Sequence, residues 1–130
     1  MNIFEDQAGF MKLAEQTIDK VDREQADRYI HHVQEEFNEL LHAEASGDPI
    51  ERLDALTDLI VVSAGALISL VGAERAEGCW DAVYSANLRK VAGGRVNRPD
   101  GQVGKPENWH GPQRILENIA QDAGLMDEDK

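Results

Sequence analysis

The fold is decided by residues 29–60, which read YIHHVQEEFNELLHAEASGDPIERLDALTDLI. In the first part of this stretch, apolar side chains recur every three or four residues, as on one face of an amphipathic helix. They are Tyr29, Ile30, Val33, Phe37, Leu40 and Leu41. The segment Ser46-Gly47-Asp48-Pro49 breaks the pattern, and a second apolar repeat follows it. Because the link is so short, the sequence predicts two long helices that pack antiparallel.

Along the rest of the chain, the same spacing predicts an all-α fold with helices at about residues 6–19, 23–45, 49–72, 74–91 and 113–123. Asp22 is placed to cap the second helix, and Pro49 suits the first turn of the third. The third helix carries the longest apolar run and is expected to be the most buried. Its small residues, Ser63, Ala64, Gly65 and Ala66, would let another helix approach closely, within the subunit or across a dimer interface.

The chain is expected to form a single domain, residues 1–130. Its length suits one hydrophobic core, and its 42% hydrophobic and 29% charged residues are typical of a globular protein. The predicted ordered core spans about residues 6–91. Glycines and prolines are frequent in residues 92–112, which predicts a long functional loop. Trp109 indicates that part of this loop docks on another surface.

Charge and composition exclude several classes of function. The net charge of −12 argues against polymeric nucleic acid as a partner, because phosphate backbones require clustered Lys and Arg. Cys79 is the only cysteine, so no intrachain disulfide is possible, and a reducing cytoplasm is the expected location. The N-terminus lacks the pattern of a secretion signal, and the run at residues 59–72 is shorter than a membrane span needs.

Acidic side chains gather on the second and third predicted helices. Glu35, Glu36 and Glu39 lie within about one turn, and Asp54 and Asp58 are four residues apart. Antiparallel packing would bring Glu36 and Glu39 opposite Asp58, at the edge of the apolar run. Such carboxylates suit Mg²⁺ or Mn²⁺ together with substrate phosphates. The alternative is a solvated acidic surface without a ligand.

Cations and amides for phosphate binding are expected further along the chain. Asn87 and Lys90 share a face of the fourth helix, and the loop adds Arg95, Arg98 and Lys105. A solvated helix end and an ordinary surface loop are the competing interpretations. The histidines of the second helix precede its glutamates, unlike the Glu-x-x-His of di-iron bundles, so we interpret them as ordinary helix residues. They are His31, His32 and His42.

Three motifs in order give the chain a recognisable signature. They are Glu35-Glu36-Phe37-Asn38-Glu39-Leu40, Asp54-Ala55-Leu56-Thr57-Asp58-Leu59 and Asn87-Leu88-Arg89-Lys90. With Asp100-Gly101-Gln102-Val103-Gly104-Lys105-Pro106, the chain resembles the MazG-like superfamily of all-α nucleotide pyrophosphohydrolases. It most resembles the phosphoribosyl-ATP pyrophosphohydrolase-like branch found in bacteriophages. The resemblance runs from about residue 10 to residue 112.

The resemblance implies a MazG-like helical bundle, assembled as a dimer or tetramer, that hydrolyses a nucleoside triphosphate to the monophosphate and pyrophosphate. It implies two or three Mg²⁺ or Mn²⁺ ions per site, held by Glu35, Glu36, Glu39 and Asp58, with Asp54 as a further ligand. Asn87 and Lys90 would hold phosphate, joined by Lys105 and Arg98 of the loop. For a phage-encoded chain, the location would be the host cytoplasm.

The motifs also depart from the superfamily pattern. Ala55 stands where many members have a glutamate, although the phage branch favours Asp-x-x-x-Asp, and Ala86 and Gln102 are further substitutions. Phage members include MazZ-type enzymes for purine deoxynucleotides, so dATP and dGTP are the favoured substrates. The base preference would be set by residues of the first two helices such as Phe10, Gln16 or Ile30. The rival hypotheses are a non-catalytic acidic helical interaction protein, or the same fold acting on another nucleotide.

Overall fold

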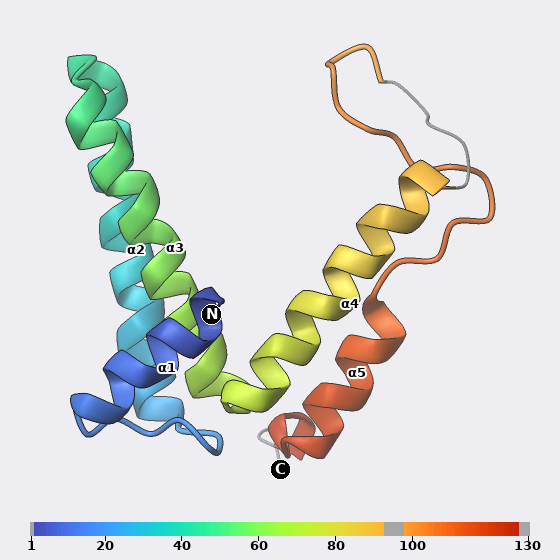
Figure 1. Ribbon diagram of the computed structural model, residues 1–130, viewed down its shortest axis with the longest axis horizontal. Helices are drawn as coiled ribbons and strands as arrows, with labels where there is room; N and C mark the ends of the chain where they lie inside the picture. The colour runs from blue at the N-terminus through green and yellow to red at the C-terminus, as the bar shows by residue number, and fades with distance from the viewer. Residues whose placement is uncertain (1, 93–97, 128–130) are drawn as a thin grey trace.

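The protein is an all-helical chain with no β-strand among the residues that the structure, a computed structural model, describes, namely 2–92 and 98–127. Figure 1 shows its elements in order. They are α1 (Ile3–Leu13), α2 (Arg23–Ser46), α3 (Pro49–Val71), α4 (Ala73–Ala92), α5 (Gln113–Asp122) and the short 3-10 helix η1 (Leu125–Asp127). The predicted all-α class is confirmed, and four of the five helices begin and end within about two residues of the prediction. Arg95 lies outside the described residues.

The first helix differs from its predicted range, residues 6–19. It begins at Ile3, because the side chain of Asn2 accepts a hydrogen bond from the backbone N–H of Glu5 and caps it. It ends at Leu13, and Glu15 then adopts a positive φ of 60°. Ile18, which continues the apolar repeat in the sequence, instead lies in the connection between α1 and α2 and packs against the core.

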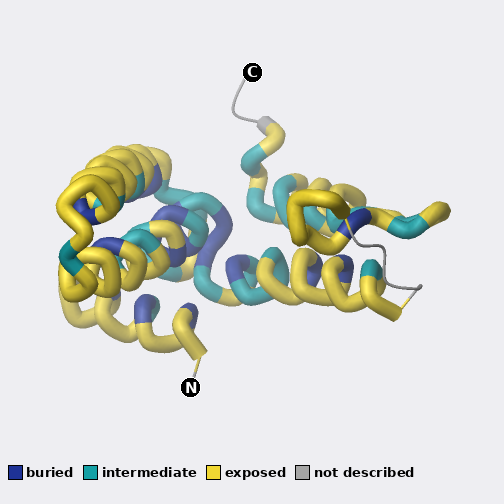
Figure 2. Tube along the Cα trace, turned by 90° about the horizontal axis from the view of Figure 1, so that it is seen from above, coloured by how far each residue is buried: buried dark blue, intermediate teal, exposed yellow. Residues whose placement is uncertain are grey.

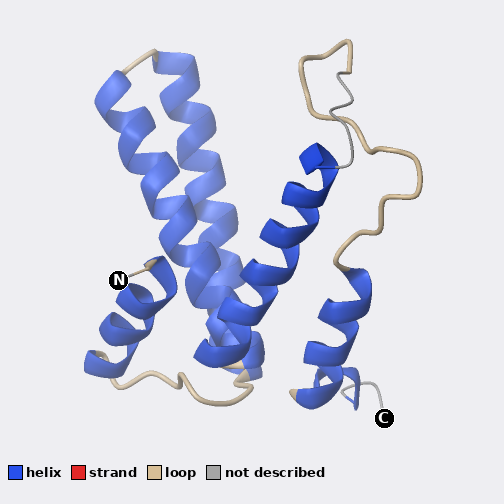
Figure 3. Ribbon diagram, turned by 45° about the vertical axis from the view of Figure 1, so that its right-hand side comes forward, coloured by secondary structure: helices blue, strands red, loops and turns tan. Residues whose placement is uncertain are grey.

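The α2–α3 hairpin is the central unit and confirms the predicted antiparallel pair (Figure 3). Asp22 caps α2 by accepting from the N–H of Gln25, and a further hydrogen bond from the Thr17 hydroxyl helps to hold the pKa of Asp22 below its ordinary value. At the tip, Gly47 adopts the left-handed conformation that ends α2. Asp48 caps α3, and Pro49 occupies its first turn as predicted.

The hydrophobic core lies at the base of this hairpin, where α1 and α4 join it. Its fully buried members include Met11 and Ile68. The third helix contributes more buried residues than any other, as predicted, and they concentrate in its second half (Figure 2). Gly65 is buried against Tyr29, and a Cβ at this position would overlap the tyrosine ring. The predicted close approach at the small residues therefore occurs within the subunit.

Beyond the core, α4 diverges from the α2–α3 hairpin and packs with α5, so the chain forms a V with two arms (Figure 1). Large apolar side chains are exposed along both arms. On α3 they include Leu56 and Ile60, and on α4 they include Trp80, Tyr84 and Leu88, each close to half exposed. An apolar surface of this extent is unusual for an isolated subunit.

The helix α3 is apolar over most of its length, although its second half is largely buried in the core. By length and composition alone, α3 is long and apolar enough to cross a membrane. The core helices of soluble proteins meet the same criteria. Asp54 and Asp58 lie within the same helix, and α2, packed along it, is rich in charged residues.

Candidate metal centre

The carboxylate trio consists of Glu36 and Glu39 on α2 and Asp58 on α3. One carboxylate oxygen from each of the three residues lies within 4.8 Å of the others. Glu36 and Glu39 are three residues apart on one helical face, and the antiparallel packing of the hairpin brings Asp58 against that face. Three carboxylates that converge in this way can hold one divalent cation of the Mg²⁺ type, with water completing its coordination.

The electrostatics of the trio favour a cation. The Oε2 atom of Glu36 is buried and has no hydrogen-bond partner. Burial raises the pKa of Glu36 above its ordinary value of 4.5, and the nearby carboxylate of Glu39 together with the charges of Asp58 and Asp54 raises it further. Within the described residues, no Lys or Arg forms an ion pair with the trio. The trio thus gathers negative charge that no Lys or Arg of residues 2–92 and 98–127 neutralises by an ion pair.

Glu35 does not join the trio. Its carboxylate instead contacts two histidines of α2, with Oε1 lying 2.9 Å from His31 Nε2 and Oε2 3.7 Å from His32 Nδ1. All three side chains are more than half exposed. Of the five metal ligands expected from the sequence, the structure therefore brings three together in the trio. Glu35 lies on an adjacent, solvated face of the helix, and Asp54, the fifth, lies outside the trio.

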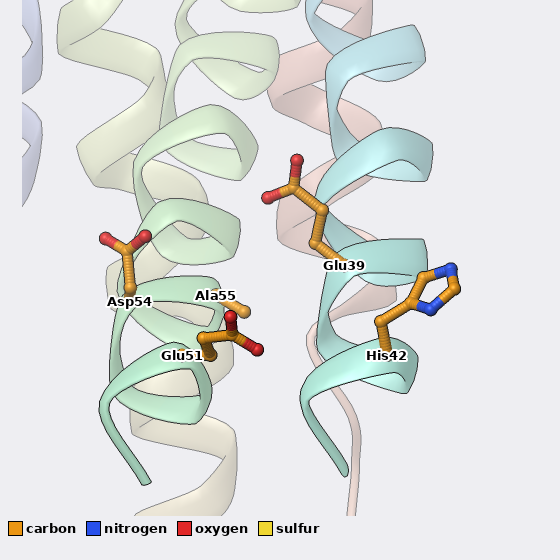
Figure 4. Close-up of a pocket in the computed structure, with 5 residues that line it drawn as sticks. All are labelled: Glu39, His42, Glu51, Asp54 and Ala55. Carbon is orange, nitrogen blue, oxygen red and sulfur yellow. The ribbon is translucent and has the colours of Figure 1, made fainter. Parts of the chain in front are cut away.

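Asp54 lines a cavity of about 330 Å³ between the trio and the tip of the hairpin, together with Glu39, His42, Glu51 and Ala55 (Figure 4). Sequence reasoning missed Glu51, although it lies three residues before Asp54, the same helical spacing that pointed to the other carboxylates. The acidic surface thus extends by one turn toward the tip.

The predicted phosphate-binding residues gather on the other arm. The Nζ atoms of Lys90 and Lys105 lie 4.9 and 5.5 Å from the ring centre of Trp109, whose indole N–H donates to the carbonyl of Ala86 at 2.7 Å. The docking role expected of Trp109 is therefore present, and it brings the two lysines to one place. Asn87 is exposed on α4 beside them.

Arg98 lies on the same arm but is already paired, its guanidinium 2.8 Å from the carboxylate of Asp100. Because α4 diverges from the hairpin, the last turns of α4 and its docked loop lie apart from α2 and α3 in both side views (Figures 1 and 3). Within one chain, the structure therefore separates the acidic trio from the predicted phosphate-binding cations.

No protein-family model matches the chain, and no curated protein is significantly similar to it.

Proposed function

We propose that the protein is a divalent-metal-dependent nucleoside triphosphate pyrophosphohydrolase, which cleaves between the α and β phosphates to give a monophosphate and pyrophosphate. The observation that carries the proposal is the convergence of Glu36, Glu39 and Asp58, with an unpartnered buried oxygen and a raised pKa at Glu36. Hard cations prefer such oxygen ligands and retain sites for water and phosphate. Purine deoxynucleotides, dATP and dGTP, are the favoured substrates, by resemblance to the phage branch.

The residues of the trio would act as metal ligands. Glu36, Glu39 and Asp58 hold Mg²⁺ or Mn²⁺ at the α2–α3 interface, and Asp54 and Glu39 line the adjoining cavity where a second ion would fit. When bound, the ions neutralise the polyphosphate and lower the pKa of an attacking water. Glu35, exposed one position away, is retained as a further candidate ligand. No covalent enzyme intermediate is required.

Lys90, Lys105 and Asn87 are proposed to hold the phosphates, with Arg98 joining them when it is released from Asp100. Since they lie on the other arm of the V, we propose that a second copy of the chain brings them to the trio, in a homodimer or a homotetramer built from such dimers. Trp80 and Tyr84 are 53% and 52% exposed, and half of an aromatic side chain amounts to roughly 100 Å². Several such residues along the arms cover much of the roughly 800 Å² that each partner gives a standard interface.

The test is pyrophosphate release from each common ribo- and deoxyribonucleoside triphosphate, with Mg²⁺ or Mn²⁺ and again with chelator. We expect metal-dependent turnover that favours the purine deoxynucleotides. Glu39→Ala and Asp58→Ala should each reduce kcat by at least about a hundredfold, since each removes a ligand. Asp27→Asn, on the exposed part of α2, is the charge-matched control and should retain full activity.

Two outcomes would redirect the assignment. Folded parent protein without metal-dependent turnover would favour the acidic interaction protein, for which the exposed apolar arms would serve as the docking surface. Turnover confined to a different nucleotide would retain the chemistry and replace the substrate.

A further inference from the structure

Two lysines from different parts of the chain lie against one indole ring. Lys90 belongs to the last turn of α4, and Lys105 belongs to the loop that follows it. Their Nζ atoms lie 4.9 and 5.5 Å from the ring centre of Trp109. The face of an indole ring attracts a cation, so the ring favours this placement of both ammonium groups. We call Trp109 and the two lysines the indole platform.

Two hydrogen bonds tie the indole platform to α4. The indole N–H donates to the carbonyl oxygen of Ala86 at 2.7 Å, about one helical turn before Lys90. The carbonyl oxygen of the next loop residue, His110, accepts from the guanidinium of Arg89 at 3.4 Å. The platform therefore has a fixed place beside the last turns of α4, where Asn87 is also exposed.

A tight turn in the loop brings Lys105 over the ring. The backbone N–H of Trp109 donates to the carbonyl oxygen of Pro106 at 3.2 Å, which closes a turn of four residues. The third residue of this turn, Asn108, has a φ of 65°, a left-handed conformation that asparagine tolerates better than most residues. Lys105 directly precedes the turn and Trp109 ends it, so the turn places the lysine beside the indole.

The indole platform gathers two positive charges without a carboxylate to neutralise them. Neither lysine forms an ion pair within residues 2–92 and 98–127, whereas Arg98 of the same loop is paired with Asp100. Like charges held at one place repel each other, and an anion that contacts both relieves the repulsion. Lysine ammonium groups bind phosphate oxygens well, and two of them suit two linked phosphates better than a single phosphate.

We propose that Trp109 is a positioning residue of the phosphate site, which holds Lys90 and Lys105 together so that they bind the two phosphates that leave as pyrophosphate. Trp109 acts through the lysines and does not itself contact the phosphates. This inference rests on the proposed nucleotide hydrolysis, in which both lysines hold phosphate. It adds the residue that arranges the lysines and the part of the substrate that they bind.

The first measurement is calorimetric titration of pyrophosphate, and separately of orthophosphate, into the metal-free protein. We expect the parent to bind pyrophosphate at least tenfold more tightly than orthophosphate. Trp109→Leu should lose most of this preference because its lysines no longer converge, and Trp109→Phe, which keeps an aromatic face, should retain part of it. Lys90→Gln should also weaken pyrophosphate binding at least fivefold, whereas Lys12→Gln, at an exposed position on α1, is the matched control and should bind like the parent.

A double-mutant cycle separates a positioning role from a general loss of structure. Lys105→Gln should weaken pyrophosphate binding at least fivefold in the parent and have almost no effect in Trp109→Leu, because the loop lysine has already left the site there. If Lys105→Gln weakened binding by the same factor with and without Trp109, the lysine would not depend on the ring and the proposal would be wrong.

The turn provides a second test that leaves the ring and both lysines in the chain. Valine disfavours the positive φ of residue 108, whereas glycine adopts it readily. Asn108→Val should therefore weaken pyrophosphate binding severalfold, and Asn108→Gly should bind like the parent. Pyrophosphate binding that is equal in these two variants would overturn the arrangement proposed for Lys105.

The positioning role and the proposed reaction fail separately. Metal-dependent turnover, with KM and pyrophosphate affinity unchanged in Trp109→Leu, would overturn the indole platform and leave the pyrophosphohydrolase intact. Pyrophosphate binding that is lost in Trp109→Leu, in a protein without metal-dependent turnover, would support the platform and overturn the proposed reaction.

Discussion

Glu36→Gln should change the stability of the protein in opposite directions with and without metal. In the metal-free protein, Glu36 has a buried, unpartnered oxygen and a pKa raised by burial and by its acidic neighbours. An acid whose folded pKa is raised loses stability as the pH increases from its unfolded value, here 4.5, through the folded value. The metal-free parent should therefore weaken across this range, whereas Glu36→Gln should not, leaving the variant more stable near neutral pH.

With metal the order reverses, and the size of the effect can be worked out. Mn²⁺ at about 100 times its Kd stabilises the folded state by about 2.7 kcal/mol. For 130 residues, unfolding entropies of about 2.1 cal/mol/K per residue correspond to a Tm increase of about 10 °C. Removing a ligand weakens binding by about a hundredfold or more, so the same Mn²⁺ concentration gives Glu36→Gln about 0.4 kcal/mol, or about 1.5 °C.

The assay is thermal unfolding followed by circular dichroism, with Mn²⁺ or with chelator, at one fixed protein concentration because association also shifts Tm. Asp27→Asn removes one exposed charge from the same helix and should keep the full Mn²⁺ response. An equal Mn²⁺ response in Glu36→Gln and the parent would refute the reasoning, as would a metal-free variant less stable than the parent near neutral pH.

Three further predictions concern packing and assembly. Gly65→Ala should destabilise the folded protein by about 1–3 kcal/mol, because the new Cβ overlaps the ring of Tyr29. Gly9→Ala, with open space around it, should stabilise the protein by up to about 1 kcal/mol through α1. Urea unfolding measures both free energies. Trp109→Leu removes a hydrogen bond and two cation–π contacts worth about 2 kcal/mol together, so trypsin should cleave the loop at residues 98–112 roughly thirtyfold faster. Ile60→Asp should shift the mass measured by light scattering toward the monomer, while Leu13→Asp, at an 87% exposed position on α1, should not.

Much of the fold could be predicted from the sequence because its signals are local. The apolar repeat locates the helices, and Asp22 and Asp48 cap α2 and α3. The end of α1 could not be predicted in this way, because Ile18 continues the apolar spacing while the chain has already turned at Glu15. There the tertiary contacts of Ile18 with the core, rather than helical periodicity, decide its position.

Which of the two neighbouring glutamates joins the trio could not be predicted from the sequence. Glu35 and Glu36 differ by about 100° around the helix, and each has helical spacing to Glu39, at four and three residues. Spacing alone therefore cannot decide which of the two faces α3. The side of α2 that packs on α3 decides it, and that side depends on where Tyr29 fits over Gly65, a contact between residues 36 positions apart.

The separation of the two arms leads to a final prediction about how the site is completed. If Lys90 of one copy serves the trio of another, Glu39→Ala and Lys90→Ala should each be nearly inactive alone yet complement each other when mixed. Random exchange makes half of the dimers mixed, and each mixed dimer has one site with an intact trio and an intact lysine, giving roughly one quarter of the parent activity. If Lys90 instead served the trio of its own chain, every site in the mixture would lack one of the two groups, and the activity would stay at the level of the separate variants. Unfolding and refolding the mixture before the pyrophosphate assay ensures that the copies exchange, and a mixture of Glu39→Ala with Asp58→Ala, which damages the trio in every subunit, is the control that should remain inactive.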